Sequence, residues 1–290
     1  MPKSFVLGNG NIFVGLDSNA QVKDFYFPYV GLENQVGFEN EHMIGIFVDG
    51  VFSWITTGSW DIQIKEKEET LASNITAENH NLLIKIEFTD IIYNEKNIFI
   101  RKLKVLNLSD RKREIRIFFY QRFILHQSFA GDTGYFDPIN NMVIHYKGQR
   151  VFAVNSFNGD QGFDSFSIGN FGIEGKEGTF RDAEDGILTK NPIEHGRVDS
   201  VIGNTLEIDG QVETDVYYWL AVGKSIQEVI GLNAEILEKT PQHILKTTQD
   251  FWNAWVNNQL FNFHGLDEEV IDLFKKSLLI LHTHVDNDGS

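Results

Sequence analysis

The sequence contains 290 residues, of which 42% are hydrophobic, so it is long enough for one or two domains with a sizeable apolar core. Its formal net charge of −16 argues against binding to nucleic acid or to anionic membrane surfaces, because both require clustered Lys and Arg side chains. The absence of cysteine excludes disulfides, thiolate catalysis and cysteine-based zinc sites.

The N-terminal segment, residues 1–10, lacks the charged region followed by an apolar one that a secretory signal would have. No uncharged apolar run approaches the ~18 residues that indicate a membrane span. These features predict a soluble, cytoplasmic protein with no membrane partner. The acidic charge is compatible with neutral partners such as sugars, which need no electrostatic attraction.

The sequence up to about position 223 shows the period-2 alternation of half-buried β-strands. Ile84, Ile86 and Phe88 share one phase, and charged residues lie between them. The same alternation appears in two further segments, 99–105 and 114–119. Such strands suit antiparallel sheets with one face on a core, and 24 Phe residues supply large apolar side chains for it.

Three dipeptides in this region have the chemistry of turns, because Gly adopts a positive φ at little cost. Asp49-Gly50 and Asp209-Gly210 each lie between two alternating segments and predict tight hairpins, and Asn158-Gly159 is a third candidate. Many strands joined by turns predict a mostly β fold of the sandwich or barrel type.

The pattern changes to a helical one after Gly223. Ser225 and Glu228 have the spacing of a capping box, which predicts the start of a helix. Thr240 followed by Pro241 predicts the end of that helix and the start of a second one.

A third helix is predicted to begin at Asp267, with Glu268 and Glu269 placed favourably for the helix dipole. It would run to about Val285, five residues before the sequence ends. Its predicted apolar face comprises Val270, Ile271, Phe274, Leu278 and Leu281. Because little sequence follows to cover this face, we expect a chain that is the front part of a larger protein, with self-association through helix 267–285.

The densest carboxylate cluster of the β region is Arg181-Asp182-Ala183-Glu184-Asp185-Gly186. Two carboxylates can act as acid and base when both face one substrate. Alternating acids in a turn need not do so, and an acidic, solvated turn closed by Gly186 is the favoured explanation.

Three other patterns resemble ligand sites but have simpler explanations. His282 and His284 are two positions apart on a helix and therefore do not face the same way. Residues 8–11 lack the Gly-Lys-Ser/Thr of a phosphate loop, and residues 286–289 lack the acidic residue that closes a calcium loop. The sequence therefore predicts neither a metal nor a cofactor.

An aromatic run, Phe25-Tyr26-Phe27-Pro28-Tyr29, precedes the polar residues Glu33, Asn34 and Gln35. Exposed, these rings could stack against sugars; buried, they would belong to the core or to a domain interface. Pro28 and the polar residues after it favour a loop that packs on another part of the protein.

An ordered set of short segments is more specific than any of these motifs alone. The set comprises residues 7–11, 24–31, 33–34, 131–138, 181–186, 191–193, 198–200, 219–224, 251–255 and 276–279. Taken together, it resembles the prokaryotic glucoamylases of glycoside hydrolase family 15 over essentially the whole chain.

The resemblance implies three parts: an antiparallel β-supersandwich over residues 1–223, a helical linker over 224–265, and the start of a catalytic (α/α)6 barrel over 266–290. Such enzymes cleave glucose from the non-reducing ends of α-glucans or maltooligosaccharides with inversion. One glutamate acts as general acid and another as general base. Both belong to the barrel beyond Ser290, so the resemblance assigns no catalytic residue here and leaves the substrate-binding residues unknown.

The matched segments also supply candidates for contacts between the domains. These are Tyr26, Phe27, Tyr29, Arg181, Asp182 and Asp185. Two alternatives to a non-catalytic supporting role stay open. The sandwich could bind glucan through Tyr26, Tyr29, Trp54 or Trp60, or the chain could have an assembly role through its last helix.

Overall fold

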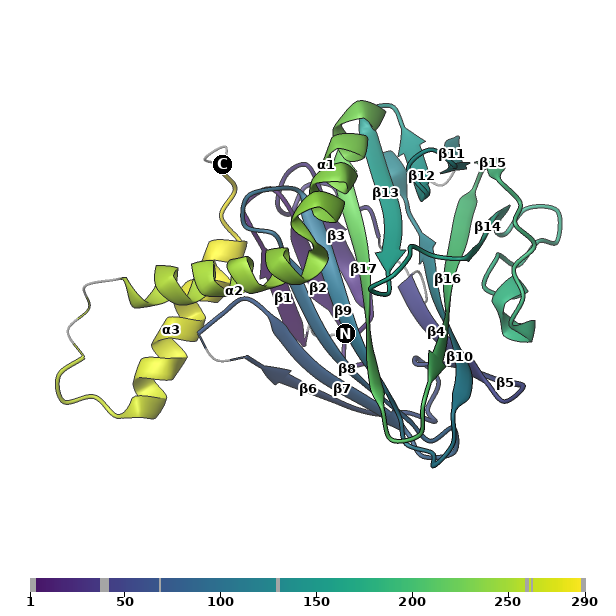
Figure 1. Cartoon of the computed structure of the whole chain (residues 1–290). Coiled ribbons are helices and arrows are strands. Elements are labelled where there is room, and N and C mark those ends of the chain that lie inside the picture. The colour runs from purple at the N-terminus through teal and green to yellow at the C-terminus, as the bar shows by residue number, and fades with distance from the viewer. Residues whose placement is uncertain are drawn as a thin grey trace.

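The computed structural model describes residues 4–36, 42–67, 69–128, 131–258, 261 and 263–287. Over these residues the strands form three antiparallel sheets, and three α-helices follow them (Figure 1). The predicted mostly β fold, with helices after the sheets, is therefore confirmed.

The largest sheet has the strand order β15-β11-β12-β13-β17-β9-β8-β7-β6 within the described residues. Its strands are β6 (Asp61–Glu66), β7 (Ser73–Asn79), β8 (Ile84–Ile92), β9 (Ile98–Asn107), β11 (Asp132–Asp137), β12 (Met142–Lys147), β13 (Arg150–Phe157), β15 (Ile193–Gly196) and β17 (Glu213–Gly223). The long central strands give this sheet two broad faces.

The second sheet has the order β14-β16-β10-β4-β5, and the third is a small meander, β1-β2-β3. Their strands are β1 (Phe5–Gly8), β2 (Phe13–Leu16), β3 (Val22–Tyr26), β4 (His42–Val48), β5 (Val51–Trp54), β10 (Arg113–Arg122), β14 (Ser165–Asn170) and β16 (Val198–Ile208). The helical elements are the short 3-10 turns η1 (Leu125–Gln127) and η2 (Asp182–Asp185), and the helices α1 (Ile226–Lys239), α2 (Pro241–Asn257) and α3 (Glu268–Thr283).

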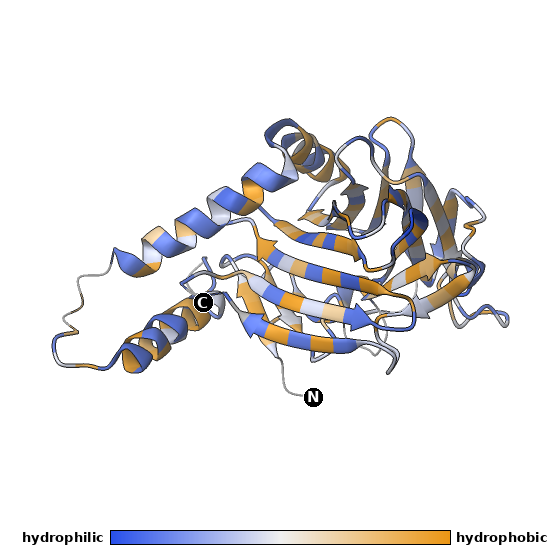
Figure 2. Cartoon of the chain, turned by 60° about the horizontal axis from the view of Figure 1, so that its bottom comes forward, coloured by the Kyte–Doolittle hydropathy of each residue, from blue (hydrophilic) through white to orange (hydrophobic). Residues whose placement is uncertain are grey.

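The main core lies between the inner faces of the sheets, where apolar side chains alternate with outward-facing polar ones. Ile84, Ile86 and Phe88 are buried, while Lys85 and Glu87 between them are partly exposed, as the alternation predicts. Figure 2 shows this alternation as hydrophobic and hydrophilic bands along neighbouring strands.

Parts of the outer faces of the two large sheets are also covered. Helix α1 lays Val229 and Ile236 against Trp219 on the nine-stranded sheet. The segment around η2 lays Ala183 and Leu188 on the outer face of the five-stranded sheet. Strands covered on both faces need apolar side chains on both, which explains why β17 is apolar over most of its length.

One of the predicted tight hairpins is confirmed and another is wrong. Asp49 and Gly50 join β4 to β5 in a two-residue turn, and both have a positive φ. Between β16 and β17 the connection is four residues long, from Asp209 to Val212, and the positive φ belongs to Gln211 rather than to Gly210. The strand register there is set by hydrogen bonds from Gln211 to the β9–β10 connection, which the dipeptide does not reveal.

The helix starts follow the predicted chemistry in two of three cases. The Ser225 hydroxyl accepts a hydrogen bond from the Glu228 N–H at 3.2 Å, and the Thr240 hydroxyl accepts one from the His243 N–H. Asp267 occupies the N-cap position of α3 but makes no side-chain capping bond. No helix within the described residues has the length and apolar character needed to span a membrane.

Candidate functional site

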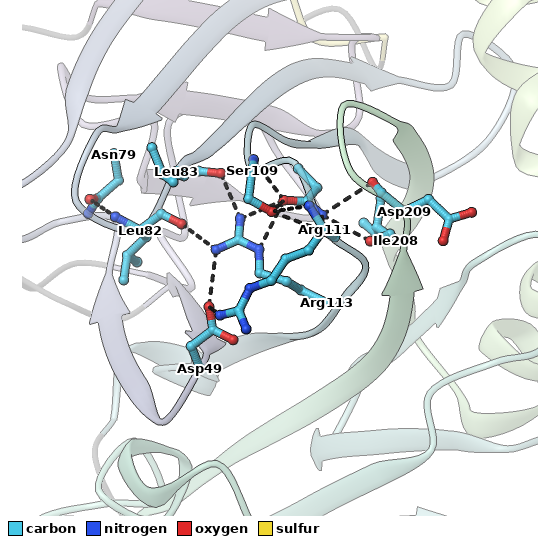
Figure 3. Close-up of polar contacts among 10 residues, drawn as sticks. Asp49, Asn79, Leu82, Leu83, Ser109, Arg111, Arg113, Ile208 and Asp209 are labelled. Carbon is cyan, nitrogen blue, oxygen red and sulfur yellow. Dashed lines mark hydrogen bonds and ion pairs between the residues drawn. The ribbon is translucent and has the colours of Figure 1, made fainter.

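The densest polar cluster closes one end of the sandwich and is centred on the buried guanidinium of Arg113 (Figure 3). Its nitrogens donate to the carbonyls of Leu82 and Leu83, both at 2.8 Å, and to the Asn107 Oδ1 at 2.7 and 2.9 Å. A longer contact of 3.4 Å reaches the Asp49 carboxylate. Arg113 thus ties together three hairpin ends.

Asn107 extends the same cluster to a fourth hairpin, because its amide nitrogen donates to the carbonyls of Arg111, Ile208 and Asp209. The hydrogen-bonding capacity of the Arg113 guanidinium and the Asn107 amide is therefore used within the protein. The cluster fixes the register of the hairpins and is a structural feature rather than a ligand site.

A second polar group lies in the interior, where Arg101 and Asp90 form a buried ion pair. The Arg101 Nε lies 2.6 Å from Asp90 Oδ1, and its Nη2 donates to the Ala20 carbonyl at 2.8 Å. The Ser73 hydroxyl donates to the other Asp90 oxygen. A buried pair is tolerated when its remaining hydrogen-bonding groups are also paired, as they are here.

Two histidines sit in the same interior, on either side of the Phe123 ring. Burial lowers the pKa of His42 to about 3 and that of His145 to about 3, so both are neutral at physiological pH. The His145 Nε2 lies 2.7 Å from the Ser200 hydroxyl. Neither ring is accessible to a polymeric substrate, and both are part of the core.

The acidic segment around η2 forms a solvated turn, as the sequence indicated. Arg181 pairs with Glu177 and Glu184 of the same segment, and the Asp182 carboxylate accepts from the N–H and hydroxyl of Thr189. The Asp185 carboxylate accepts from the Ile187 N–H.

The segment also has a clear packing role. Ala183 is fully buried at its centre, and Arg116 donates to the Gly186 carbonyl at 2.7 Å. Gly186 has a φ of +82°, and a Cβ there would lie 2.9 Å from the Phe47 ring. The Arg181–Gly186 segment therefore serves as a cover for the five-stranded sheet.

Beside η2 is an open depression of about 310 Å³. Its polar side chains bond to one another: the Asn170 amide donates to Glu194 at 2.7 Å, and the Ser167 and Thr189 hydroxyls lie 2.8 Å apart. These contacts engage part of the polar lining, whereas the buried Asn170 Oδ1 makes no hydrogen bond among the described residues.

The aromatic side chains proposed to bind glucan divide into two groups. Trp54 and Trp60 are buried, Trp54 against Phe52 and Trp60 with its indole N–H donating to Ser53. A role for these two rings in stacking on sugars is therefore wrong, because Trp60 belongs to the main core and Trp54 to the apolar cluster beneath the η2 segment. Tyr26 is partly exposed and Tyr29 is exposed.

The aromatic run lies beside the residues that follow α3. Phe27 is buried against Phe152, while the N–H of Val30 donates to the Asp286 carboxylate at 3.1 Å. In Figure 1 α3 lies at the left of the molecule, and the segment between β14 and β15, which contains η2, lies at the right. The structure therefore brings the first group of predicted interface residues, Tyr26 to Tyr29, close to α3, and leaves the second group, Arg181 to Asp185, far from it.

The most open apolar region lies around α3, and we call it the α3 junction: β1, residues 69–71, α2, α3 and residues 284–287. A hollow of about 300 Å³ lies between β1, the β6–β7 connection and α3. Apolar side chains contribute much of its lining, including Phe5, Leu71, Leu279 and Ile280.

Helix α3 is seated on the small sheet at its C-terminal end. Thr283 is fully buried against Gly8, where a Cβ would come within 2.9 Å of the Thr283 Cβ, so this close approach requires glycine. The His284 ring packs on Phe13 with 5.0 Å between centroids. The N–H of Asn287 donates to the Gly10 carbonyl at 2.9 Å.

The predicted apolar face of α3 is largely exposed. Val270 is 48% exposed, Phe274 38% and Leu281 62%, while Ile271 and Leu278 are partly buried. Leu273, outside the predicted face, is also exposed, whereas Leu279 on the side facing the sandwich is only 3% exposed. The helix therefore docks through Leu279 and Thr283, and its exposed apolar side chains form a surface of the kind that marks an interface.

The histidines of α3 lie on different sides, as their spacing predicts. The His282 ring packs between Trp252 and Trp255, with centroid distances of 5.0 and 5.1 Å, and burial lowers its pKa. Within the described ranges no group of three or more His, Asp or Glu side chains is arranged to hold a metal ion. Asp288 and Gly289, from the segment 286–289 that was compared with a calcium loop, lie outside the described residues.

One residue of the α3 junction was not found from the sequence. Glu69, between β6 and β7, accepts hydrogen bonds from Asn253 and Asn257 of α2 and pairs with Lys275 of α3. Its partners are 184 to 206 positions away, and no local pattern indicates them.

Comparison with known proteins supports the fold at low sequence identity. No family model matches the sequence. An uncharacterized glycosyl hydrolase of Methanocaldococcus jannaschii is 22% identical over 98% of this chain, which corresponds to 45% of that protein. The chain thus spans about half the length of this relative.

Among solved structures, a bacterial glucoamylase complexed with acarbose superposes with a TM-score of 0.75 at 17% identity. The match covers 97% of this chain and 40% of that one. A putative kojibiose phosphorylase from the human microbiome gives a TM-score of 0.52 at 11% identity, covering 87% of this chain and 35% of the other. The chain has a glucoamylase-like fold, as the resemblance implied.

Proposed function

We propose that this chain is the non-catalytic N-terminal part of an exo-acting, inverting α-glucan hydrolase of the glucoamylase type, and that it supports the catalytic barrel. In this proposal residues 1–223 are the supersandwich, 224–265 the linker, and 266–290 the start of an (α/α)6 barrel whose first helix is α3. The parent protein is cytoplasmic and acts on an α-glucan or maltooligosaccharide.

The extent of the structural match supports this division. The bacterial glucoamylase matches 97% of this chain with 40% of its own length, which leaves more than half of that protein unmatched. The M. jannaschii glycosyl hydrolase is matched over 45% of its length. Both comparisons fit a chain that corresponds to one part of a larger hydrolase.

The single observation that carries the proposal is the two-sided character of α3. One side, with Leu279 and Thr283, is buried against the sandwich, and the other exposes Leu273 and Leu281. A helix that is apolar on both sides is normally enclosed between two layers. The further helices of a barrel would supply the second layer.

The roles of individual residues follow from this arrangement. No residue of the chain is assigned to catalysis, because the resemblance places the acid and base glutamates in the barrel. Among the interface candidates, Tyr26, Phe27 and Tyr29 fit a domain contact because this run lies beside the residues that follow α3. Arg181, Asp182 and Asp185 would reach a second domain only if it also extended to the η2 end.

The proposal is tested by reading the coding sequence beyond the codon for Ser290. We expect an open frame that encodes several further amphipathic helices and at least two glutamates at helix ends or in the loops between them. A stop codon directly after Ser290 would remove the enzyme proposal for this protein. In that case glucan binding should be measured by calorimetric titration with maltoheptaose.

A further inference from the structure

The carboxylate of Glu69 binds residues of both of the last two helices. It accepts from the Asn253 amide at 3.0 Å and from the Asn257 amide at 2.9 Å, both on α2. Its other oxygen pairs with the Lys275 ammonium of α3. One side chain thus contacts three groups from two helices.

The three partners are also connected to one another. The Lys275 ammonium donates to the Asn257 Oδ1 at 2.8 Å, so α2 and α3 are bridged directly next to Glu69. Lys67, two residues before Glu69, donates to Gln249 of α2 at 2.9 Å. The hydrogen bonds and the positive charge beside it lower the pKa of Glu69 and keep it ionised at neutral pH.

The backbone at Glu69 is in an unusual conformation for its residue type. Its φ is +55°, in the left-handed region that residues other than Gly adopt at a cost. A glycine would relieve this cost but would lack the carboxylate. The strained backbone directs the Glu69 side chain toward the helices, beyond the end of the β6–β7 hairpin.

The contact between Glu69 and Lys275 lies far enough along α3 to restrict the direction of the helix. The helix is seated on the small sheet near Thr283, at its C-terminal end. Lys275 lies two turns earlier, close to the middle of the helix, and the hollow of about 300 Å³ separates the two contacts. With only the C-terminal seat, α3 could rotate about that end.

We infer that Glu69 is a positioning residue that sets the angle at which α3 projects from the sandwich and from α2. If α3 is the first helix of the barrel, as the proposed function requires, Glu69 also sets the orientation of the catalytic part. The geometric claim itself concerns this chain alone and can be tested without any activity.

The test uses spin labels, which the absence of native cysteine makes straightforward. Cysteines replace the exposed residues Glu238 on α1 and Asp272 on α3, and the distance between labels is measured by double electron–electron resonance. The native chain should give one narrow distance peak. Glu69→Ala should lose that peak in favour of a broad, displaced distribution, because alanine keeps the strained backbone and removes the acceptors.

Two controls separate positioning from general stability. Glu213→Ala removes an exposed carboxylate that pairs with Lys104 on the large sheet, and it should keep the narrow peak. Combining Glu69→Lys with Lys275→Glu should restore a narrow peak that Glu69→Lys alone lacks. If Glu69→Ala does not fold, by near-ultraviolet circular dichroism, Glu69→Met takes its place, because it has nearly the same size and lacks the carboxylate oxygens.

The inference would be overturned if Glu69→Ala, or Glu69→Met in its place, kept the native distance peak in a folded chain. It would also be overturned if Glu213→Ala broadened the peak equally. Neither result depends on whether the parent protein hydrolyses glucan, so this inference and the proposed function can fail separately.

Discussion

The sandwich and the α3 junction differ in how far their apolar side chains are enclosed by the protein. In the sandwich, apolar side chains from facing sheets enclose one another, and Arg113 and Asn107 tie its hairpin ends together. In the junction, α3 buries Leu279 and Thr283 and leaves Leu273 and Leu281 open. The sandwich is therefore held by a large shared core, whereas α3 is held by its C-terminal contacts, by the packing of His282 on Trp252 and Trp255, and by the ion pair of Lys275.

The largest difference should appear when a core ring is removed. Phe152 is fully buried and contacts Phe25, Phe27 and Phe123. Phe152→Ala should lower the free energy of unfolding by about 3–5 kcal/mol, since it combines lost burial with a cavity. Urea denaturation followed by tryptophan fluorescence measures this. A loss below about 1 kcal/mol would mean that the ring is not enclosed as described.

The Arg113 cluster should be nearly as important, through polar rather than apolar contacts. Arg113→Ala leaves the carbonyls of Leu82 and Leu83 and the Asn107 oxygen without their donors. We expect a loss of about 3 kcal/mol, because buried acceptors without partners are costly. Arg111→Ala is the matched control, since that side chain is exposed, and it should cost less than about 0.5 kcal/mol.

The substitution Asp199→Asn should stabilise the sandwich, and this stabilisation should be seen at neutral pH and not at acidic pH. Burial raises the pKa of Asp199 to about 6, against 3.8 for the ordinary carboxyl. Between these values the unfolded chain releases the proton while the folded chain keeps it, so stability falls as the pH rises through this window. Asp199→Asn removes this penalty and should raise the free energy of unfolding by up to about 3 kcal/mol at pH 7.5.

The pH dependence provides the internal control for that variant. At pH 3.5 the carboxyl is mostly protonated in the unfolded chain as well as in the folded one, so the stability of Asp199→Asn should be close to that of the native chain. The amide oxygen of Asn can still accept from the Thr179 N–H, the bond that Asp199 makes at 2.8 Å. Equal stabilisation at pH 3.5 and pH 7.5 in chemical denaturation would contradict the assigned cause.

The smallest effect on stability should come from the exposed face of α3. Leu281→Glu should change the free energy of unfolding by less than about 0.5 kcal/mol, because the side chain is mostly exposed. It should nevertheless reduce the self-association that we predict for the isolated chain. Light scattering over a concentration series measures the average molar mass of the native chain and of Leu281→Glu. A native chain that stays monomeric throughout would contradict the predicted self-association.

The contrast between the two regions also explains what could be predicted from the sequence. The phase of Ile84, Ile86 and Phe88 follows from local alternation, and the start of α1 at Ser225 follows from a local cap. Both depend on residues a few positions apart. Features of this kind can therefore be predicted from the local sequence.

Features that depend on distant contacts were not predicted. The buried pair of Arg101 and Asp90 is stable because Ser73 and the Ala20 carbonyl complete its hydrogen bonds, and alternation alone cannot show this. Gln211 takes the positive φ between β16 and β17 because it bonds to the neighbouring hairpin. The role of Glu69 depends on three partners from two helices, far along the chain.

The side on which α3 docks was the least predictable feature. The periodic apolar positions predicted a face containing Val270, Phe274 and Leu281, and the structure leaves these exposed while Leu279 is buried. A helix with two apolar sides does not specify which one contacts a given neighbour. On the proposed function, the strongly periodic face is the one that would contact the barrel.

The central claim is that this chain supports a catalytic part without being catalytic itself. The most direct measurement is glucose release from maltoheptaose, run in parallel with the purified 290-residue chain and with the polypeptide extended through the downstream coding sequence. We predict glucose release by the extended protein and none by the shorter chain. Comparable release by the 290-residue chain, or no release by an extended protein that is folded, would contradict the account.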